Sequence, residues 1–348
     1  MAIRRWNEDA RLTCMILLLF AGSAAQAAGG VMADIGRQIC VGHLMLELPV
    51  NAKVSVAGSY RGIQAERRER VGFDSLVDEL GARAQRMEAR KVEHDAYAAA
   101  IYRSGGVDPE GLFGESQLLG FDSDQVQELA VLGYHDKPGE ATITVELHRL
   151  FDGSGYVFRV DNLGANRYAA VRDSVIRASS RFQPLHKDEA PEGPGFCVGN
   201  GLFVEDGVRD VGGDATLVAT FPDYPEVSFS VDVFGVAEPS REGGLQSRID
   251  GELGLLTRAA PGARTLRTGP QRYAERDGYL VAISASDEGE RVQKFFWSAE
   301  GIPGDARKPM LEIQLMAGDS GPSPLDDDEL GALWDRLLAG LRQRPGAI

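Results

Sequence analysis

The chain has 348 residues, of which 43% are apolar and 26% charged, and its formal net charge at pH 7 is −15. This length favours two domains, because single hydrophobic cores stop growing at about 250–300 residues. The composition is that of a globular protein rather than a disordered one. A chain this acidic repels phosphate backbones and anionic lipid headgroups. We therefore expect no nucleic-acid partner and no direct membrane insertion, and we favour a basic protein surface as the partner.

The first 27 residues have the pattern of a signal peptide. Three arginines precede a mostly apolar run at 12–21, and Ala25-Gln26-Ala27 is a small-residue cleavage signal. The apolar run is too short to cross a bilayer as a helix, which takes about 20 residues. We expect export and cleavage after Ala27, and loss of the three arginines and two acids of this segment would leave a net charge of −16.

Two short stretches of the remaining chain resemble each other. Cys40-Val41-Gly42 and Cys197-Val198-Gly199 each follow an apolar residue, and each leads into a short apolar run that ends in acid. They contain the only cysteines beyond residue 27 and lie almost half the chain length apart, which suggests one domain plan used twice. An oxidising compartment favours a Cys40–Cys197 disulfide. Two buried free thiols, each packed in its own half, are the alternative.

The first predicted domain covers residues 36–183. A helix is indicated where Phe73, Leu80 and Met87 share one face at helical spacing. Strands are indicated by alternating apolar positions, and Asp152-Gly153-Ser154-Gly155 predicts a hairpin turn between two of them. The predicted elements in chain order are strands at 44–48 and 54–69, a helix at 73–87, an irregular region at 104–120, strands at 126–134, 143–148 and 156–161, and a helix at 168–182.

Prolines and charged residues at 184–194 predict a linker between two domains. The second predicted domain, residues 195–345, repeats the order of the first. Its predicted elements are strands at 196–205, 217–221 and 227–234, a helix at 245–256, strands at 264–274, 279–285, 291–298 and 309–316, and a helix at 330–341. The expected fold class is therefore α+β, with two similar domains, each a mainly antiparallel sheet with packed helices.

No enzyme motif is complete. Gly318-Asp319-Ser320-Gly321 resembles the serine stretch of chymotrypsin-like proteases, but Pro322 replaces the second glycine, and we expect a turn there. Asp122, Asp124 and Glu128 lack the spacing of a calcium loop and are expected to be solvated. The histidines have no metal-site spacing; they are His43, His94, His135, His148 and His186. We predict no catalytic, cofactor or metal site, and expect His148 to be solvated.

Aromatic residues offer the candidates for partner contact. Phe295-Phe296-Trp297 is predicted to be a strand buried on both faces rather than a binding stripe. Tyr224 between two prolines and Phe113 in a glycine-rich region are predicted to be more exposed, and hence available to a partner.

The leader, the run from Ile39-Cys40-Val41-Gly42 to Pro49, the second start at 195–199 and the terminal helix together resemble a known family. That family is the periplasmic immunity proteins that neutralise type VI secretion phospholipase effectors, in the class cognate to the fourth Tle lipase group. The resemblance implies a periplasmic, non-enzymatic protein without cofactor. It also implies a one-to-one complex in which two α+β domains clamp the lid or cap of a cognate lipase and prevent self-intoxication. It assigns no individual contact residues.

Two other functions stay open at this point. An exported envelope hydrolase that uses scattered carboxylates would need a deep pocket holding acids whose pKa values diverge. A structural envelope module would need a large apolar surface patch. A lipase encoded by a neighbouring gene would favour the immunity function over both.

Overall fold

The computed structural model describes residues 35–68, 72–91, 99–100, 103–104, 115–137, 142–186, 190–205, 212–238, 262–287, 290–318 and 321–347. In the first half the elements are β1 (Ile35–Val41), β2 (Leu44–Pro49), β3 (Lys53–Tyr60), β4 (Ile63–Arg68), α2 (Phe73–Ala89), β5 (Leu118–Asp124), β6 (Leu129–His135), β7 (Thr142–Phe151), β8 (Ser154–Gly164), η2 (Ala165–Arg167), α4 (Tyr168–Ser179) and β9 (Phe182–Pro184). In the second half they are β10 (Gly195–Val198), β11 (Gly201–Val204), β12 (Gly213–Phe221), β13 (Tyr224–Phe234), β14 (Arg264–Tyr273), β15 (Arg276–Asp287), β16 (Glu290–Ala299), β17 (Met310–Ala317), α6 (Asp327–Ala339) and β18 (Arg342–Gln343).

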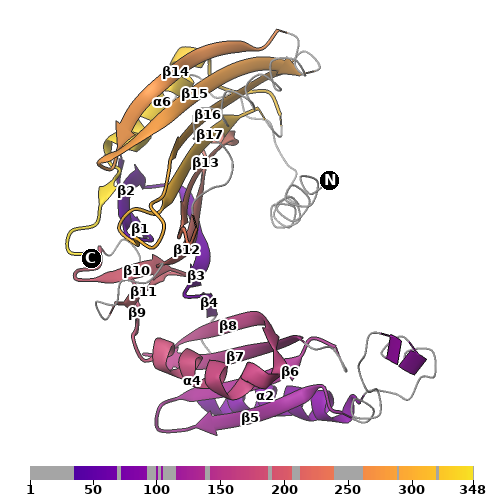
Figure 1. Cartoon of the computed structure of the whole chain (residues 1–348). Helices are drawn as coiled ribbons and strands as arrows, with labels where there is room; N and C mark the ends of the chain where they lie inside the picture. Colours follow the sequence, from indigo (N-terminus) through magenta and orange to yellow (C-terminus); the bar gives the residue numbers. More distant parts are fainter. Residues whose placement is uncertain are drawn as a thin grey trace. The chain divides into compact units, whose positions relative to one another are not determined.

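A twelve-stranded antiparallel sheet runs through both halves, with the order β14-β15-β16-β17-β13-β12-β3-β4-β8-β7-β6-β5 (Figure 1). The strands on either side of the β3–β12 pair follow equivalent orders. One side runs β3, β4, β8, β7, β6, β5, and the other runs β12, β13, β17, β16, β15, β14. Val56 of β3 pairs with Leu217 of β12, and these two residues occupy equivalent places in the two halves. The sheet thus has an internal pseudo-twofold relation at that pair, as expected for one plan used twice.

Two small sheets exchange strands between the halves. β9 closes the first half and pairs with β11 of the second, while β18 closes the second half and pairs with β2 of the first. The backbone repeats the exchange: Leu185 N–H donates to the carbonyl of Asn200, and Arg344 N–H donates to that of His43. Each half therefore completes a sheet that begins in the other. The domain bounds at residues 36–183 and 195–345 and the linker at 184–194 stay a prediction.

Helices α2 and α4 cover opposite faces of the outer strands of the first half. Phe73, Leu76 and Leu80 of α2 pack with Ala130 of β6. On the other face the Tyr168 ring at the start of α4 lies directly against Gly133, so close that a β-carbon there would collide with it. Because side chains alternate along a strand, neighbouring positions of β6 serve the two helices. Figure 1 shows α4 lying along β7 and β8.

Aromatic rings join the two halves at the centre. Phe203 of β11 contacts Phe182 of β9, with ring centroids 5.0 Å apart, and Tyr60 of β3, at 5.2 Å. Phe158 of β8 contacts both Phe182 and Phe203. Phe158, Phe182 and Phe203 are almost fully buried. Aromatic side chains bury the most area per residue, so this cluster contributes a large share of the cohesion between halves.

Two predicted single strands are hairpins. The strand predicted at 54–69 turns at Arg61-Gly62, and the strand predicted at 196–205 turns at Gly199-Asn200; all four residues have positive φ. Such two-residue turns match the twist of the flanking strands. The strand predicted at 44–48 is confirmed as β2, which pairs with β1 across a turn where Gly42 has φ 56°.

Other expectations are corrected by smaller amounts. The helix predicted at 168–182 ends at Ser179, so Phe182 belongs to β9. The region predicted irregular at 104–120 contains the start of β5, and the strand predicted at 126–134 is β6, which begins at Leu129. The helix predicted at 245–256 lies outside the described residues. The helix predicted at 73–87 and the hairpin at Asp152-Gly153 are present.

The last helix begins with a capping box. The Asp326 carboxylate accepts from the backbone N–H of Asp328 and Glu329, and the Glu329 side chain accepts from the N–H of Asp326. The three acids of the first turn also oppose the positive end of the helix dipole. The α+β class with mainly antiparallel sheet is confirmed. Among the described residues, no helix has the length and apolarity needed to cross a membrane.

Candidate functional site

The two Cys-Val-Gly motifs meet at the centre of the fold. Cys40 and Cys197 form a disulfide with their Cα atoms 5.8 Å apart. Next to it, Gly42 and Cys197 exchange both backbone N–H···O=C bonds at 2.9 Å. Met45 and Leu202, one from each second hairpin strand, pack around the sulfurs. The bond therefore links equivalent hairpins of the two halves, which the sequence placed far apart.

Two buried basic residues, His43 and Arg344, lie beside these hairpins. His43 Nε2 is 3.1 Å from Glu205 Oε1, and the His43 side chain is 4% exposed. Arg344 is buried and donates to the carbonyls of Pro191, Gly193 and Gly195. Because those carbonyls belong to the segment that connects the halves, Arg344 fixes the C-terminal end of the chain onto it.

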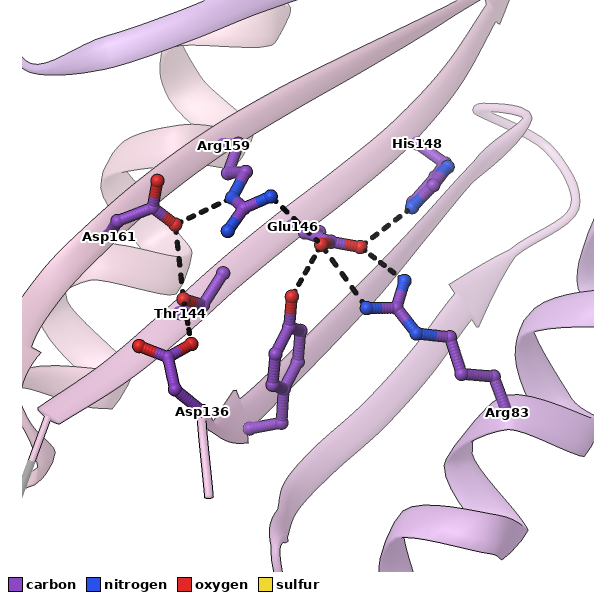
Figure 2. A network of polar contacts seen from close by, with 8 residues as sticks. Arg83, Asp136, Thr144, Glu146, His148, Arg159 and Asp161 are labelled. Atoms are coloured by element: carbon purple, nitrogen blue, oxygen red, sulfur yellow. Dashed lines mark hydrogen bonds and ion pairs between the residues drawn. The ribbon is translucent and has the colours of Figure 1, made fainter. Parts of the chain in front are cut away.

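A buried polar network lies on β7, where the sequence predicted a solvated face (Figure 2). The Glu146 carboxylate accepts hydrogen bonds from Nη1 and Nη2 of Arg83 on α2, at 2.6 and 3.3 Å. It also accepts one from the Tyr134 hydroxyl, at 2.5 Å. His148 Nε2 lies 3.4 Å from the same carboxylate. The expectation for His148 is wrong: it is 1% exposed, because α2 covers this face of the sheet.

The network continues along the strand to a second group. Arg159 Nη1 lies 4.0 Å from Glu146, and its Nε donates to Asp161 at 2.6 Å. The Thr144 hydroxyl lies within 3.0 Å of a carboxylate oxygen of Asp161 and within 2.8 Å of one of Asp136. Figure 2 shows these side chains directed toward one another from neighbouring strands.

The environment shifts the pKa values of Glu146 and Tyr134 in opposite directions. Burial alone would raise the pKa of Glu146, but hydrogen bonds from His148, Arg83 and Tyr134 outweigh it and hold that pKa far below its usual range. Burial, together with the hydrogen bond to Glu146, raises the pKa of Tyr134 to about 12. At neutral pH the carboxylate is therefore charged and the phenol neutral.

This arrangement is suited to stabilising the sheet rather than to catalysis. The Glu146 carboxylate is bonded to three neighbouring side chains, so its oxygens are occupied. Neither the cavity of about 270 Å³ beside the disulfide nor the one of about 240 Å³ beside Arg344 is lined by Glu146, His148 or Arg83. Sequence analysis missed the network, although Arg83 lies between Leu80 and Met87 on the apolar face of a predicted helix. A charge in that position is a signal that the opposing strand supplies a partner.

The remaining candidate residues that the structure describes lie on separate elements. His135 is buried on β6, His186 is exposed after β9, and His94 lies outside the described residues. Asp124 accepts from the backbone N–H of Val126 and Gln127 and so shapes an exposed turn. Gly318 and Gly321 flank two residues that lie outside the described range. The part of the chain that the structure describes contains no group of three or more His, Cys, Asp or Glu that could hold a metal ion.

The aromatic candidates have different environments. Phe295 and Trp297 are fully buried under α6, where the Phe295 and Trp334 rings lie 5.6 Å apart. Phe296 lies on the other face and is only half-buried, so that face of the strand is partly accessible to solvent. Tyr224 is half-buried at the start of β13, and Phe113 lies outside the described residues.

One row of residues crosses the central strands on the side away from α6. Register pairing places these residues side by side on β3, β12, β13, β17 and β16. We call this row the open face; its members are Ser55, Val218, Ser230, Gln314 and Phe296. Ser55 and Val218 are exposed and the other three are half-buried, whereas the residues that alternate with them, such as Leu217 and Val231, are fully buried.

Known proteins share this fold. The apo immunity protein TplEi of the type VI secretion system from Pseudomonas aeruginosa superposes with a TM-score of 0.71, at 19% identity, over 89% of this chain and 97% of that one. The Tle4-Tli4 complex matches with a TM-score of 0.71, at 18% identity, over the same shares of the two chains. TplEi complexed with "L" peptide, also from Pseudomonas aeruginosa, matches with a TM-score of 0.65, at 21% identity, over 89% of this chain and 98% of that one.

The second half of the chain also matches a known family by sequence. No curated protein matches the chain by sequence. The family model of the Tle cognate immunity protein 4 C-terminal domain matches residues 189–346. This range contains the second Cys-Val-Gly motif and the terminal helix on which the family resemblance was based, and the resemblance is confirmed. Residues 189–346 are thus similar in sequence to the C-terminal domain of the Tle cognate immunity protein 4 family.

Proposed function

We propose that this protein is a periplasmic immunity protein that binds a cognate type VI secretion phospholipase effector and inhibits it without turning over a substrate. The observation that carries the proposal is the family match over residues 189–346, together with a fold shared with immunity proteins across 89% of the chain. One of those structures is a complex with an effector, Tle4. Export after cleavage at Ala27 would put the protein in the compartment where it protects the cell's own lipids.

Tight inhibition needs a large complementary surface. Stable complexes bury about 1,600 Å² in total and depend on a few central residues. The open face offers a preformed surface on rigid strands. Serines and Val218 lose little side-chain entropy on binding, which lowers the cost of association. We place the effector on this face, with the two halves of the chain holding its lid or cap closed.

The disulfide and the exchanged strands support such a clamp. Both halves contribute strands to the same sheets, so the surface is preorganised before the effector arrives. Preorganisation reduces the ordering cost that would otherwise be subtracted from the binding free energy. The net charge of −15 also favours fast encounter with an effector that carries a basic face.

The test uses a type VI secretion phospholipase effector of the Tle4 class, and a lipase encoded beside this protein's gene would be the first to assay. The two proteins are expected to purify together, and lipase activity on phospholipid vesicles to fall to background at one equivalent of the immunity protein. Val218→Arg, on the open face, is expected to weaken the complex at least tenfold. Val126→Arg is the matched control, because Val126 is 94% exposed on the β5–β6 turn, away from the open face. Undiminished lipase activity at a tenfold excess of the wild-type protein would rule the proposal out.

A further inference from the structure

The pseudo-twofold relation is broken at one hairpin. β3 and β4 pair only at the two positions next to their turn, Tyr60–Ile63 and Ser59–Gln64. The equivalent strands β12 and β13 pair at every position of β12 from Ala215 to Phe221. Among the described residues, no strand pairs with Lys53–Gly58 on the side away from β12. We call this side of β3 the free edge.

The separation of β3 from β4 begins at a glycine. Gly58 has φ 147°, and a β-carbon there would collide with the Asp214 carbonyl oxygen of β12. Its counterpart in the second half, two residues after Leu217, is Ala219, which stays paired with β13. A side chain at position 58 is therefore excluded by the backbone of β12, and the pairing with β4 ends where this close contact occurs.

The backbone of the free edge has unused hydrogen-bonding groups. The Arg61 N–H donates to the Gly212 carbonyl, on the β12 side of the hairpin. Main-chain groups alternate in direction along a strand. Val54 and Val56 therefore direct their N–H and C=O groups away from β12, to the side where the described chain offers no partner strand. These groups can pair with a strand added from outside.

The side chains at this edge are partly uncovered. Val54 and Val56 are half-buried, whereas their partners on β12, Ala219 and Leu217, are fully buried. The cavity of about 270 Å³ beside the disulfide is lined by Val56 from β3 and Arg67 from β4, so it lies where the two strands separate. A strand added at the free edge would cover the valines and place a side chain in this cavity.

The outer edge of the same sheet is protected, and the free edge of β3 is not. On β14, Pro270 lies opposite Tyr279 of β15, and the exposed Arg267 and Arg272 lie on either side of it along the strand. Proline and charged side chains on edge strands prevent pairing with other chains. The free edge contains no proline, and its one charged residue, Lys53, is at its end. An unprotected edge is expected where a partner strand pairs.

We propose that an extended, acidic segment of the effector binds as an added strand along the free edge of β3. This inference rests on the proposed function and specifies how the complex forms. In strand addition, main-chain hydrogen bonds provide affinity, and pockets for alternate side chains provide specificity. Ser55 of β3 belongs to the open face, so the free edge is continuous with the surface proposed for the effector.

Charge favours an effector segment over a second copy of this chain. The β3–β4 hairpin carries four basic residues and one acidic residue, in a chain whose net charge is −15. These residues are Lys53, Arg61, Arg67, Arg68 and Glu66. Two copies paired edge to edge would bring these basic hairpins together, whereas a segment that carries carboxylates complements them.

Hydrogen–deuterium exchange resolved to single amides tests the pairing. The probe is a Tle4-class phospholipase effector, added at saturating concentration to the full exported protein. The Val54 and Val56 amides should exchange rapidly in the free protein and at least about tenfold more slowly in the complex. The Ser55 and Ala57 amides, which face β12, should change much less. Simple coverage of the surface would not produce this alternation.

Proline substitutions test the same main-chain contact. Val56→Pro removes an N–H that faces the free edge and should raise the Kd for the effector at least about tenfold. Thr268→Pro is the matched control, because Thr268 lies two residues before Pro270 on β14 and likewise faces away from its partner strand. It should leave the Kd within about twofold of the wild type. Thermal melts check that both variants fold, and the exchange measurement on the wild type needs neither.

The outcomes separate this inference from the proposed function. If the effector binds and is inhibited while the Val54 and Val56 amides exchange as in the free protein, strand addition alone is overturned. Absence of binding overturns both. Protection of these amides in the free protein that increases with protein concentration would identify a second copy at the edge and overturn the effector segment as its occupant.

Discussion

Replacement of Glu146 by Ala tests the buried network most sharply. The substitution removes the carboxylate, 5% exposed, that accepts from Arg83, Tyr134 and His148. The Arg83 side chain is 30% exposed and can rehydrate, whereas the Tyr134 hydroxyl and His148 are buried and lose their partner. Two unsatisfied buried groups at about 1 kcal/mol each, and about 1 kcal/mol for the lost ion pair, give a loss of about 3 kcal/mol in the free energy of unfolding.

Guanidinium chloride titration followed by circular dichroism measures this loss. Glu66→Ala, at an exposed position of β4, is the control and should stay within about 0.5 kcal/mol of the wild type. The pH dependence adds a second check. Because the folded-state pKa of Glu146 is depressed, its stabilisation is present above the unfolded pKa of about 4.3 and is lost as pH falls through the folded value. The gap between wild type and Glu146→Ala should be constant from about pH 8 to 5 and shrink below about pH 4. A loss under about 1 kcal/mol would refute the reasoning.

Three further predictions concern the frame of the fold. Replacement of Cys40 and Cys197 by Ser removes a disulfide between residues 157 positions apart. The gain in chain entropy of the unfolded state should lower the free energy of unfolding by up to about 5 kcal/mol. Equal unfolding midpoints of the wild type with and without reductant would contradict this. Gly199→Ala should cost more than Gly153→Ala, although both glycines have positive φ, because a β-carbon at 199 collides with the Ala65 carbonyl while Gly153 faces open space. Thermal melts would compare the two variants, and equal shifts would argue against the close approach. Asp326→Ala removes the cap of α6 and should cost about 1 kcal/mol, measured by chemical denaturation, with Asp328→Ala as a milder control because Asp328 offers only its charge to the helix dipole.

Local patterns were enough to predict most of the described strands. They also predicted α2 and α6, whose apolar residues recur at helical spacing. Phe73, Leu80 and Met87 lie on the buried face of α2 as predicted, because an apolar stripe at helical spacing has few other solutions. The turn at Asp152-Gly153 follows from residues that tolerate positive φ. The hairpins at Arg61-Gly62 and Gly199-Asn200 use the same backbone conformation, but their apolar flanks read as continuous strands.

What could not be predicted depends on contacts between distant segments. Thr144, Glu146 and His148 alternate with apolar residues as a solvated face would, and only α2 lying across β7 shows that they are buried. The pairing of β3 with β12 and of β18 with β2 depends on register between segments more than 100 residues apart. The pairing of β9 with β11 crosses the segment predicted to be a linker between domains. The repeated Cys-Val-Gly was the only local sign that the two halves meet.

Inhibition of a Tle4-class phospholipase effector by this protein tests the account most directly. Purified lipase, assayed on phospholipid vesicles while this protein is added stepwise, should lose activity linearly and reach background at one equivalent. At lipase concentrations near the Kd, Val126→Arg should behave as wild type and Val218→Arg should have a Kd at least tenfold higher. Lipase activity that stays unchanged through a tenfold excess, or release of fatty acid by the immunity protein alone, would contradict it.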